Sequence, residues 1–445
     1  TGMLMLLGVY CAGVYGGSVS AILIKSPGTP ASAATALDGY ELAKQGKAGS
    51  ALRMALIAST IAGILSALVL IFIAPQVAKF ALRFGPAEFF ALALFGLTMI
   101  ASVSGKSIIK GVIMGFLGMF VATIGLDPIG GMPRFSFDNR YLMGGVALIP
   151  ALVGLFAISE IITRAQTAHL KNKEENPFVD TKLPFSEWKK HIKTILKSSG
   201  IGTFVGAIPG TGAAIAAFMS YNEAYRSSKN KKMFGKGSME GVAASEAGNN
   251  GVTGATLIPL LTLGIPGDTV TAVMLGALLM QGLTPGPQLF TDHTDIVYTI
   301  MIGLIIVNII MFIQGRLAIR LFVRITSIPV GLLLPVLLVL CFIGAYGVNN
   351  TLFDVGLMMV FGVIGYIAPK FGFPVTPMLL GIVLGEIAES NFRRAMALSE
   401  GSWSIFVTKP IAATFIFIAI ISFFLPILSP YISKMIGKKK ESKSV

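Results

Sequence analysis

Charged side chains are scarce in this chain. Asp, Glu, Lys and Arg make up 13% of its 445 residues, whereas hydrophobic residues make up 54%. A soluble globular protein carries roughly 25% charged residues, so this composition argues against a large soluble core. Apolar runs recur along the chain, and about 20 such residues cross a bilayer. The sequence predicts membrane spans at 51–74, 87–103, 108–126, 141–162, 297–313, 330–348, 355–368, 378–388 and 411–432.

Residues that often carry catalysis or bind metals are also few. The chain has two cysteines and three histidines, and Cys11 and Cys341 stand far apart in apolar segments. This spacing excludes a disulfide framework and a zinc motif. HExxH, GxSxG and P-loop motifs are missing, and PGTG at 209–212 lacks the Lys-Ser/Thr of a Walker motif. We therefore expect neither an enzyme nor a bound cofactor.

The positive charge gathers in particular segments. Lys and Arg outnumber Asp and Glu by 35 to 21, and they concentrate in polar loops and in the C-terminal GKKKESKSV. Loops rich in Lys and Arg mark the cytoplasmic side of a membrane protein. The distribution thus predicts a basic cytoplasmic linker at 163–197 and a basic cytoplasmic tail at 434–445, and no nucleic-acid partner.

Pro-Gly pairs interrupt the apolar sequence three times. We call Pro27-Gly28, Pro209-Gly210 and Pro266-Gly267 the first, second and third breaks. Proline removes an N–H donor and glycine tolerates unusual backbone angles, so the pair ends a helix. Within a membrane, a broken helix is tolerated where its freed backbone faces protein, a cavity or a solute. The breaks therefore predict a transport site.

The second break lies in an apolar segment, 198–221, between two basic polar segments. If both flanks are cytoplasmic, this segment cannot cross the membrane once. We therefore expect it to enter and return as a re-entrant hairpin.

The order of elements predicts two repeated halves, 1–162 and 198–433. A Pro-bearing helix start follows the first break at Pro86 and the third break at Pro329. Each half then ends with a glutamate four residues before an arginine, a favourable helical pair. These pairs are Glu160–Arg164 and Glu389–Arg393. An alternative alignment pairs Pro27 with Pro209.

The repeat also predicts a missing piece. The second half holds two breaks, whereas the first half shows only one. We therefore expect a further N-terminal segment with its own hairpin before Thr1, so that 1–162 is a shortened first half.

The segment 240–290 is rich in oxygen-bearing side chains within apolar surroundings. Its oxygens come from Glu246, Asn249, Asn250, Thr253, Thr262, Asp268, Thr269 and Thr271. Polar groups at membrane depth are costly, which favours a functional role for Asn249, Asn250 and Asp268. Na⁺ prefers such oxygen ligands and the carbonyls that broken helices free, so we expect a Na⁺ site near Asn249, Asn250, Asp268 and Thr269. The glycines and threonines can equally serve close helix packing.

The first break carries polar residues of its own. Lys25 stands beside it, either as a counter-charge for an anionic substrate or as a side chain that reaches the membrane interface. Asp38 and Glu41 begin a charged stretch that we expect at the surface. Helix N-termini that follow each break suit a carboxylate. The predicted substrate-binding residues are Ser26, Pro27, Gly28, Thr29, Pro209, Gly210, Thr211, Asn249, Asn250, Pro266, Gly267, Asp268 and Thr269.

Long segments of the chain resemble a known family. YGGSVSAILIKSPGTPASAAT, GTFVGAIPGTGAAIAAF and EGVAASEAGNNGVTGATLIPLLTLGIPGDTVTAV are similar to the large transmembrane permease subunit of tripartite tricarboxylate transporters. The resemblance covers essentially the whole chain. Lys25 departs from it, because the family often has Asn or another polar residue at this position.

The resemblance implies a multi-pass permease of the bacterial inner membrane. A small membrane subunit and a periplasmic solute-binding protein would be its partners. It would import citrate or another carboxylate by symport with Na⁺ or H⁺. The expected fold is an all-α polytopic membrane protein, with two repeated halves, discontinuous helices and re-entrant Pro-Gly hairpins. A passive anion channel and a non-transporting membrane scaffold subunit are the alternatives.

Overall fold

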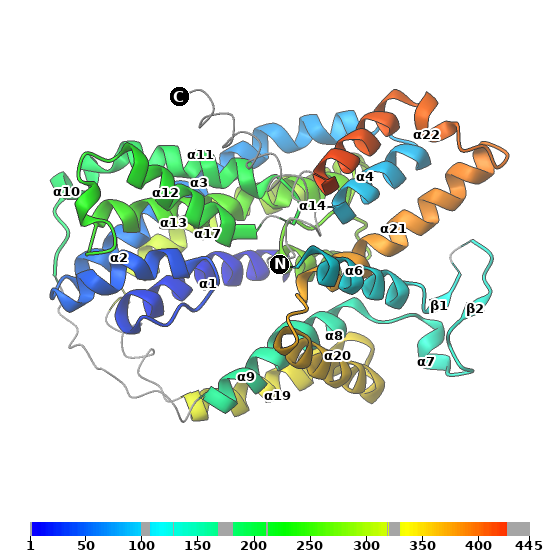
Figure 1. Cartoon of the computed structure of the whole chain (residues 1–445), viewed down its shortest axis with the longest axis horizontal. Coiled ribbons are helices and arrows are strands. Elements are labelled where there is room, and N and C mark those ends of the chain that lie inside the picture. Colours follow the sequence, from blue (N-terminus) through cyan, green and yellow to red (C-terminus); the bar gives the residue numbers. More distant parts are fainter. Residues whose placement is uncertain are drawn as a thin grey trace, which may run out of the picture. The chain divides into compact units, whose positions relative to one another are not determined.

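The described part of the chain is mainly helical (Figure 1). A computed structural model describes residues 2–98, 107–127, 129–167, 181–210, 212–317, 319 and 330–424. Six helical segments in these ranges are long and apolar enough to cross a membrane. The strands there form one antiparallel ribbon, β1 (Gly125–Leu126) with β2 (Pro133–Arg134). The predicted all-α membrane class is confirmed, while the repeated halves and the re-entrant hairpins remain predictions.

The chain divides into two compact units. Unit 1 comprises Thr1–Leu82 and Arg164–Leu337, and unit 2 comprises Arg83–Thr163 and Leu338–Val445. Each unit therefore takes residues from both predicted halves. The boundaries predicted at 162 and 198 were drawn from sequence order, and they stay a prediction.

The helices of unit 1 include all those that flank the breaks. The helical elements of unit 1 are α1 (Gly2–Ile24), α2 (Ser32–Lys44), α3 (Ala48–Ala81), α10 (Phe185–Lys190), α11 (Ile192–Gly206), α12 (Gly212–Ser227), a 3₁₀ turn (Lys231–Met233), α13 (Met239–Ala255), α14 (Leu257–Leu263), α15 (Thr269–Met280), α16 (Leu289–Asp292) and α17 (Thr294–Leu317). The helix α13 lies centrally and packs against α2, α3, α11 and α12.

Small residues bring α13 close to its neighbours. Every residue of α13 from Gly241 to Ala255 is buried. A Cβ atom added at Gly254 would lie 2.7 Å from the backbone of Ser66 on α3, and one added at Gly251 would lie 2.9 Å from the Ser199 carbonyl on α11. Close approach through small residues is how membrane helices pack without a hydrophobic driving force. Gly251 and Gly254 thus serve close helix packing, which was the alternative role for the glycines of this segment.

Unit 2 contains the remaining helices. They are α4 (Pro86–Thr98), α6 (Ile108–Ala122), α7 (Arg140–Met143), α8 (Leu148–Leu152), a π-helical segment (Val153–Ile158), α9 (Ser159–Thr167), α19 (Val330–Asn349), α20 (Leu352–Lys370), α21 (Thr376–Leu398), α22 (Ile405–Thr408) and Pro410–Phe424. Of these, α9 and α19 extend across a boundary between the units.

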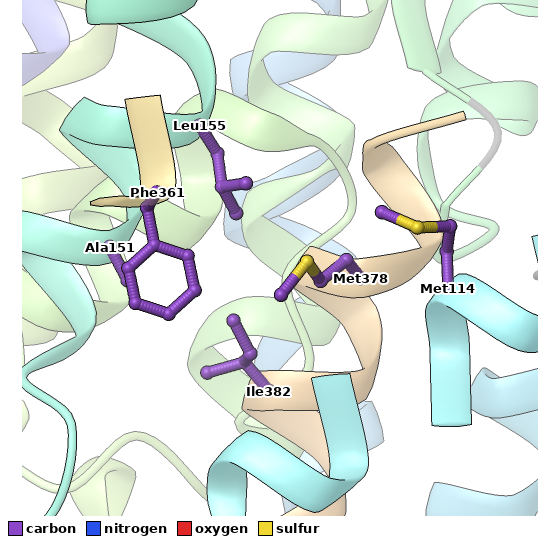
Figure 2. Packing of buried hydrophobic residues seen from close by; sticks show 6 residues of the cluster. All are labelled: Met114, Ala151, Leu155, Phe361, Met378 and Ile382. Carbon is purple, nitrogen blue, oxygen red and sulfur yellow. The ribbon is translucent and has the colours of Figure 1, made fainter. Parts of the chain in front are cut away.

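The core of unit 2 forms between α6, α8, α20 and α21. Figure 2 shows Leu155 and Phe361 close to Ala151, and Met378 beside Ile382 on α21. At the ribbon, Arg393 of α21 contacts Asp127 at 2.6 Å, and Arg134 contacts Glu389 at 2.5 Å. The Arg393 guanidinium lowers the pKa of the Asp127 carboxyl below its usual range. The predicted Glu389–Arg393 pair is present at 3.7 Å.

The predicted spans need correction at two places. The span predicted at 141–162 begins later, at Leu148, because α7 ends at Met143 and Gly145 adopts a left-handed φ of 81°. The span Gly2–Ile24 was missed, since its glycines and tyrosines interrupt the apolar run. The segment 87–103 is helical to Thr98, and its remaining residues lie outside the described ranges.

Candidate functional site

All three breaks lie in unit 1, and each separates two helices. The first break separates α1 from α2, the second separates α11 from α12, and the third separates α14 from α15. The helices flanking the first break pack along each other, as do those flanking the second. The Pro-Gly pairs therefore end helices where the sequence predicted that they would.

The breaks converge on one another. The Gly210 N–H donates a hydrogen bond to the Gly267 carbonyl at 3.0 Å, which joins the second break to the third. Beyond the first and second breaks, Ala31 and Ala34 pack against Ala217 in a buried cluster. Segments far apart in sequence thus bring their interrupted backbones into one region of unit 1.

The first break rests on α1. The Gly28 N–H donates to the Gly17 carbonyl at 3.1 Å, and a Cβ atom added at Gly28 would lie 2.6 Å from the Gly17 Cα. Ser26 donates its N–H to the Ser20 carbonyl at 3.4 Å. The Thr29 hydroxyl accepts from the Ser32 N–H at 3.2 Å and so caps the start of α2. Only glycine lets the two segments approach this closely.

Lys25 is exposed at the end of α1. Its backbone adopts a left-handed φ of 52°, and its ammonium lies 5.5 Å from the centre of the Tyr40 ring. Such a contact is a cation–π interaction. The side chain therefore has a partner on α2, beside the first break.

At the third break, Asp268 caps α15. One of its carboxylate oxygens accepts from the Thr271 N–H at 2.8 Å, and the Thr271 hydroxyl accepts from the Asp268 N–H at 2.9 Å. Tyr10 of α1 donates its hydroxyl to the other oxygen at 2.6 Å. Both carboxylate oxygens thus have partners within the chain. These contacts fix the start of α15 to α1, which gives Asp268 a structural role.

The predicted site residues outside these contacts divide into two groups. Thr211 lies outside the described residues. Asn249 and Asn250 lie on α13, both 1% exposed. Within the part of the chain that the structure describes, no hydrogen bond joins Asp268 or Thr269 to either asparagine.

Glu246 was not among the predicted site residues. It is 0% exposed. Its Oε1 accepts hydrogen bonds from the Ser18 hydroxyl of α1, at 2.5 Å, and from the Thr35 hydroxyl of α2. Its Oε2 accepts from the Ser59 hydroxyl of α3 at 3.0 Å. A glutamate one turn before Asn249-Asn250, in a helix otherwise nearly without charge, was the sequence signal for it.

The two asparagines carry polar atoms without hydrogen-bond partners. Asn250 donates from Nδ2 to the Ser59 hydroxyl at 2.8 Å and to the Glu246 carbonyl at 3.1 Å. Among the described residues, its Oδ1 has no partner, and neither amide atom of Asn249 has one. Buried polar groups are normally hydrogen-bonded, and an unpaired one is costly. Glu246, Asn249 and Asn250 share one face of α13, so we call these three residues with Ser18, Thr35 and Ser59 the Glu246 cluster.

Asp38 corrects a surface prediction. It is 0% exposed. Its Oδ1 accepts from the N–H groups of Gly235, Gly237 and Ser238 at 2.8, 3.0 and 2.8 Å, and its Oδ2 accepts from the Tyr221 hydroxyl at 2.9 Å. The turn before α13 folds over Asp38 and buries it. Glu41, in contrast, is partly exposed and pairs with Lys44 at 3.0 Å.

The fold and these sites define a multi-pass helical membrane protein whose broken helices gather in one unit. The sequence profile of the tripartite tricarboxylate transporter TctA family matches residues 1–380. The chain belongs to this family, which confirms the resemblance seen in its sequence. The family is one of transporters and not of enzymes.

Two similar proteins come from Agrobacterium vitis. An uncharacterized 52.8 kDa protein in the TAR-I ttuC' 3' region is 37% identical over 414 residues, which are 93% of this chain and 82% of that protein. An uncharacterized protein in the TAR-II ttuC' 3' region is 39% identical over 233 residues, which are 52% of this chain and 96% of that protein. No solved structure matches the chain.

Proposed function

We propose that this chain is the permease subunit of a binding-protein-dependent secondary transporter. It imports tricarboxylates or other carboxylate anions, such as citrate, with Na⁺ or H⁺. The main support is the convergence of the three breaks in unit 1, where Gly210 is hydrogen-bonded to Gly267. Discontinuous helices that meet in this way form the substrate and ion sites of many secondary transporters.

The anion would bind at the first and second breaks. Helix N-termini attract anions through their free N–H groups and the helix dipole. At α15 the carboxylate of Asp268 already accepts from Thr271. The start of α2 is capped by the neutral Thr29 hydroxyl and not by a carboxylate. We therefore place the carboxylate substrate at the starts of α2 and α12, with Ser26, Pro27, Gly28, Thr29, Pro209, Gly210 and Thr211.

The proposed cycle is alternating access. A periplasmic solute-binding protein delivers the anion to the permease and its small membrane partner in the bacterial inner membrane. The segments around the breaks close over the anion, and release of the coupling cation into the cytoplasm drives net uptake. A ligand shifts such an equilibrium only through different affinities for the two states, so the cation must bind the outward-facing state more tightly.

Uptake into proteoliposomes tests this proposal. The complex is reconstituted with its binding protein, and entry of radiolabelled citrate is measured under a Na⁺ or a pH gradient. We expect saturable, gradient-dependent uptake, which Asn250→Ala and Asp268→Ala abolish without preventing membrane insertion. Glu41→Gln, on the partly exposed side of α2, is the matched control and should transport normally.

Other results would contradict the proposal. Non-saturating flux without a cation gradient would identify a passive anion channel. An inserted, stable complex that moves no carboxylate from a panel of di-, tri- and aromatic carboxylates would identify a scaffold subunit. Normal uptake by Asn250→Ala would remove that residue from the site.

A further inference from the structure

We propose that the Glu246 cluster binds the coupling cation as Na⁺, with Glu246 supplying the balancing charge and Asn249 and Asn250 supplying amide oxygens. The role of this cation in coupling rests on the proposed function. The binding site itself is supported by the contacts within unit 1. It places the cation around Glu246, away from Asp268 and Thr269.

The Glu246 carboxylate is buried within the helices of unit 1. Glu246 is 0% exposed and its partners are hydroxyl groups. None of the ion pairs between described residues includes Glu246. An isolated carboxylate inside a membrane protein is very costly, so such groups pair with a cation or take up a proton. The cluster therefore requires a positively charged ligand.

The unpaired amide oxygens distinguish Na⁺ from a proton as the ligand. A proton bound to Glu246 would neutralise the carboxylate, but it would leave the side-chain oxygens of Asn249 and Asn250 without a partner. A Na⁺ ion can bind the side-chain oxygens of all three residues together, since hard cations bind carboxylate, amide and hydroxyl oxygens. The spacing of these residues on α13 places them on one helix face. The unpaired amide oxygens thus favour the metal ion.

Three hydroxyl groups surround the Glu246 carboxylate. Ser18, Thr35 and Ser59 each donate to Glu246. A hydroxyl can rotate and offer its lone pairs instead. The same side chains can therefore stabilise the carboxylate before binding and coordinate the cation afterwards. Backbone N–H groups could not exchange roles in this way.

The proposed cation site lies next to the first break. Ser18 follows Gly17, on whose carbonyl the first break rests, and Thr35 lies one turn into α2. A cation bound between Ser18 and Thr35 would hold α1 and α2 together next to the first break. Occupation of the Glu246 cluster would thus order the segment that we propose for the anion, and its charge would favour the anion.

Thermal unfolding of the full chain in detergent tests this site without requiring transport. NaCl is titrated against choline chloride and KCl at constant ionic strength, and ²²Na⁺ binding is measured in parallel. We expect saturable Na⁺ binding that raises the melting temperature of the wild type. A ligand that binds only the folded state stabilises it in this way.

Variants then assign the binding to the cluster. Glu246→Gln should abolish the response to Na⁺. Asn249→Ala and Asn250→Ala keep the carboxylate and should weaken Na⁺ binding about tenfold or more, so the test does not depend on one variant folding. Glu240→Gln, on the first turn of the same helix, where Glu240 contacts Thr194 and Ser228, is the matched control and should bind Na⁺ like the wild type.

Two results would overturn the inference. One is a Glu246→Gln variant with wild-type Na⁺ affinity, and the other is a wild type that responds equally to all three salts. If uptake then followed a pH gradient, the proposed transport function would stand and the Na⁺ site would fall. Conversely, Na⁺ binding lost in Glu246→Gln, in a complex that moves no carboxylate, would support the site and refute the proposed function.

Discussion

Asp38 and Glu246 are both fully buried carboxylates of unit 1, yet their partners differ in kind. Asp38 accepts from three backbone N–H groups and one tyrosine. Glu246 accepts from three side-chain hydroxyls, and unpaired amide atoms lie on the same helix face. The first arrangement is complete within the chain, whereas the second leaves polar atoms unpaired.

The difference separates a structural carboxylate from one suited to a ligand. A backbone N–H can only donate, and it stays in place for as long as the turn is folded. Asp38 therefore fixes the turn at 235–238 that precedes α13. Hydroxyls can change from donors to acceptors, so the surroundings of Glu246 can adapt to a bound cation. Asp38 positions α13, whereas Glu246 lies on the face of α13 that carries the unpaired amide atoms.

The largest expected effect is on stability, in Asp38→Ala. The buried N–H groups of Gly237 and Ser238 would lose their acceptor, at roughly 1–3 kcal/mol each. We expect the free energy of unfolding to fall by at least about 2 kcal/mol, with or without Na⁺, as measured by chemical or thermal unfolding in detergent. Glu41→Gln on the same helix should change little. A melting temperature for Asp38→Ala equal to that of the wild type would remove the structural assignment.

Glu246→Gln should give the opposite result. The amide preserves the shape of the side chain and removes an isolated buried charge, so in Na⁺-free buffer we expect a melting temperature no lower than that of the wild type. Citrate uptake in proteoliposomes should nevertheless fall to the level of protein-free vesicles. A strongly destabilised Glu246→Gln in Na⁺-free buffer would make the two carboxylates alike and contradict the comparison.

A smaller effect is expected in Ser59→Ala. This change removes one donor to Glu246 and one of the two acceptors of the Asn250 amide N–H groups. Hydrogen bonds to charged groups contribute about 1.5–3 kcal/mol, and we expect Na⁺ affinity to decrease severalfold. Ser66→Ala is the control on the same helix, because Ser66 bonds the backbone of α13 at Gly251 and Ala255. It should lower stability and leave Na⁺ affinity unchanged.

The smallest effect is expected in Asp127→Asn of unit 2. Arg393 lowers the pKa of Asp127, so this pair contributes stability above the unfolded-state pKa of about 3.9 and loses it as the pH falls below that value. The difference in melting temperature between wild type and variant should therefore be small at pH 7 and shrink in acid. Na⁺ binding should not change. A loss of Na⁺ binding in this variant would show that carboxylates outside unit 1 also control the cation.

The sequence predicted the features that local chemistry determines. Each Pro-Gly pair ends a helix through its own backbone, so the breaks at Pro27, Pro209 and Pro266 could be located from residue types alone. The membrane class followed from composition, and the family followed from the long segments that surround the breaks. The polar character of Asn249 and Asn250 in an apolar environment was equally visible.

Features that depend on distant partners could not be predicted. Asp38 stands in a charged stretch typical of a surface, and the turn that buries it lies about 200 residues away in sequence. Glu246 gains its partners from three different helices. Nothing in its own segment indicates that the hydroxyls of Ser18, Thr35 and Ser59 surround it. Tertiary packing alone brings them together.

The hydrogen bond between Gly210 and Gly267 connects main-chain atoms only. Two glycines are needed there, since Gly210 adopts a φ of 78° and a Cβ atom at Gly267 would lie 2.8 Å from Thr256. The bond itself uses no side-chain atom. Under the proposed function, neighbouring side chains can therefore change, and with them the preferred anion, while the junction between the two segments persists. Such a junction allows one scaffold to acquire many specificities.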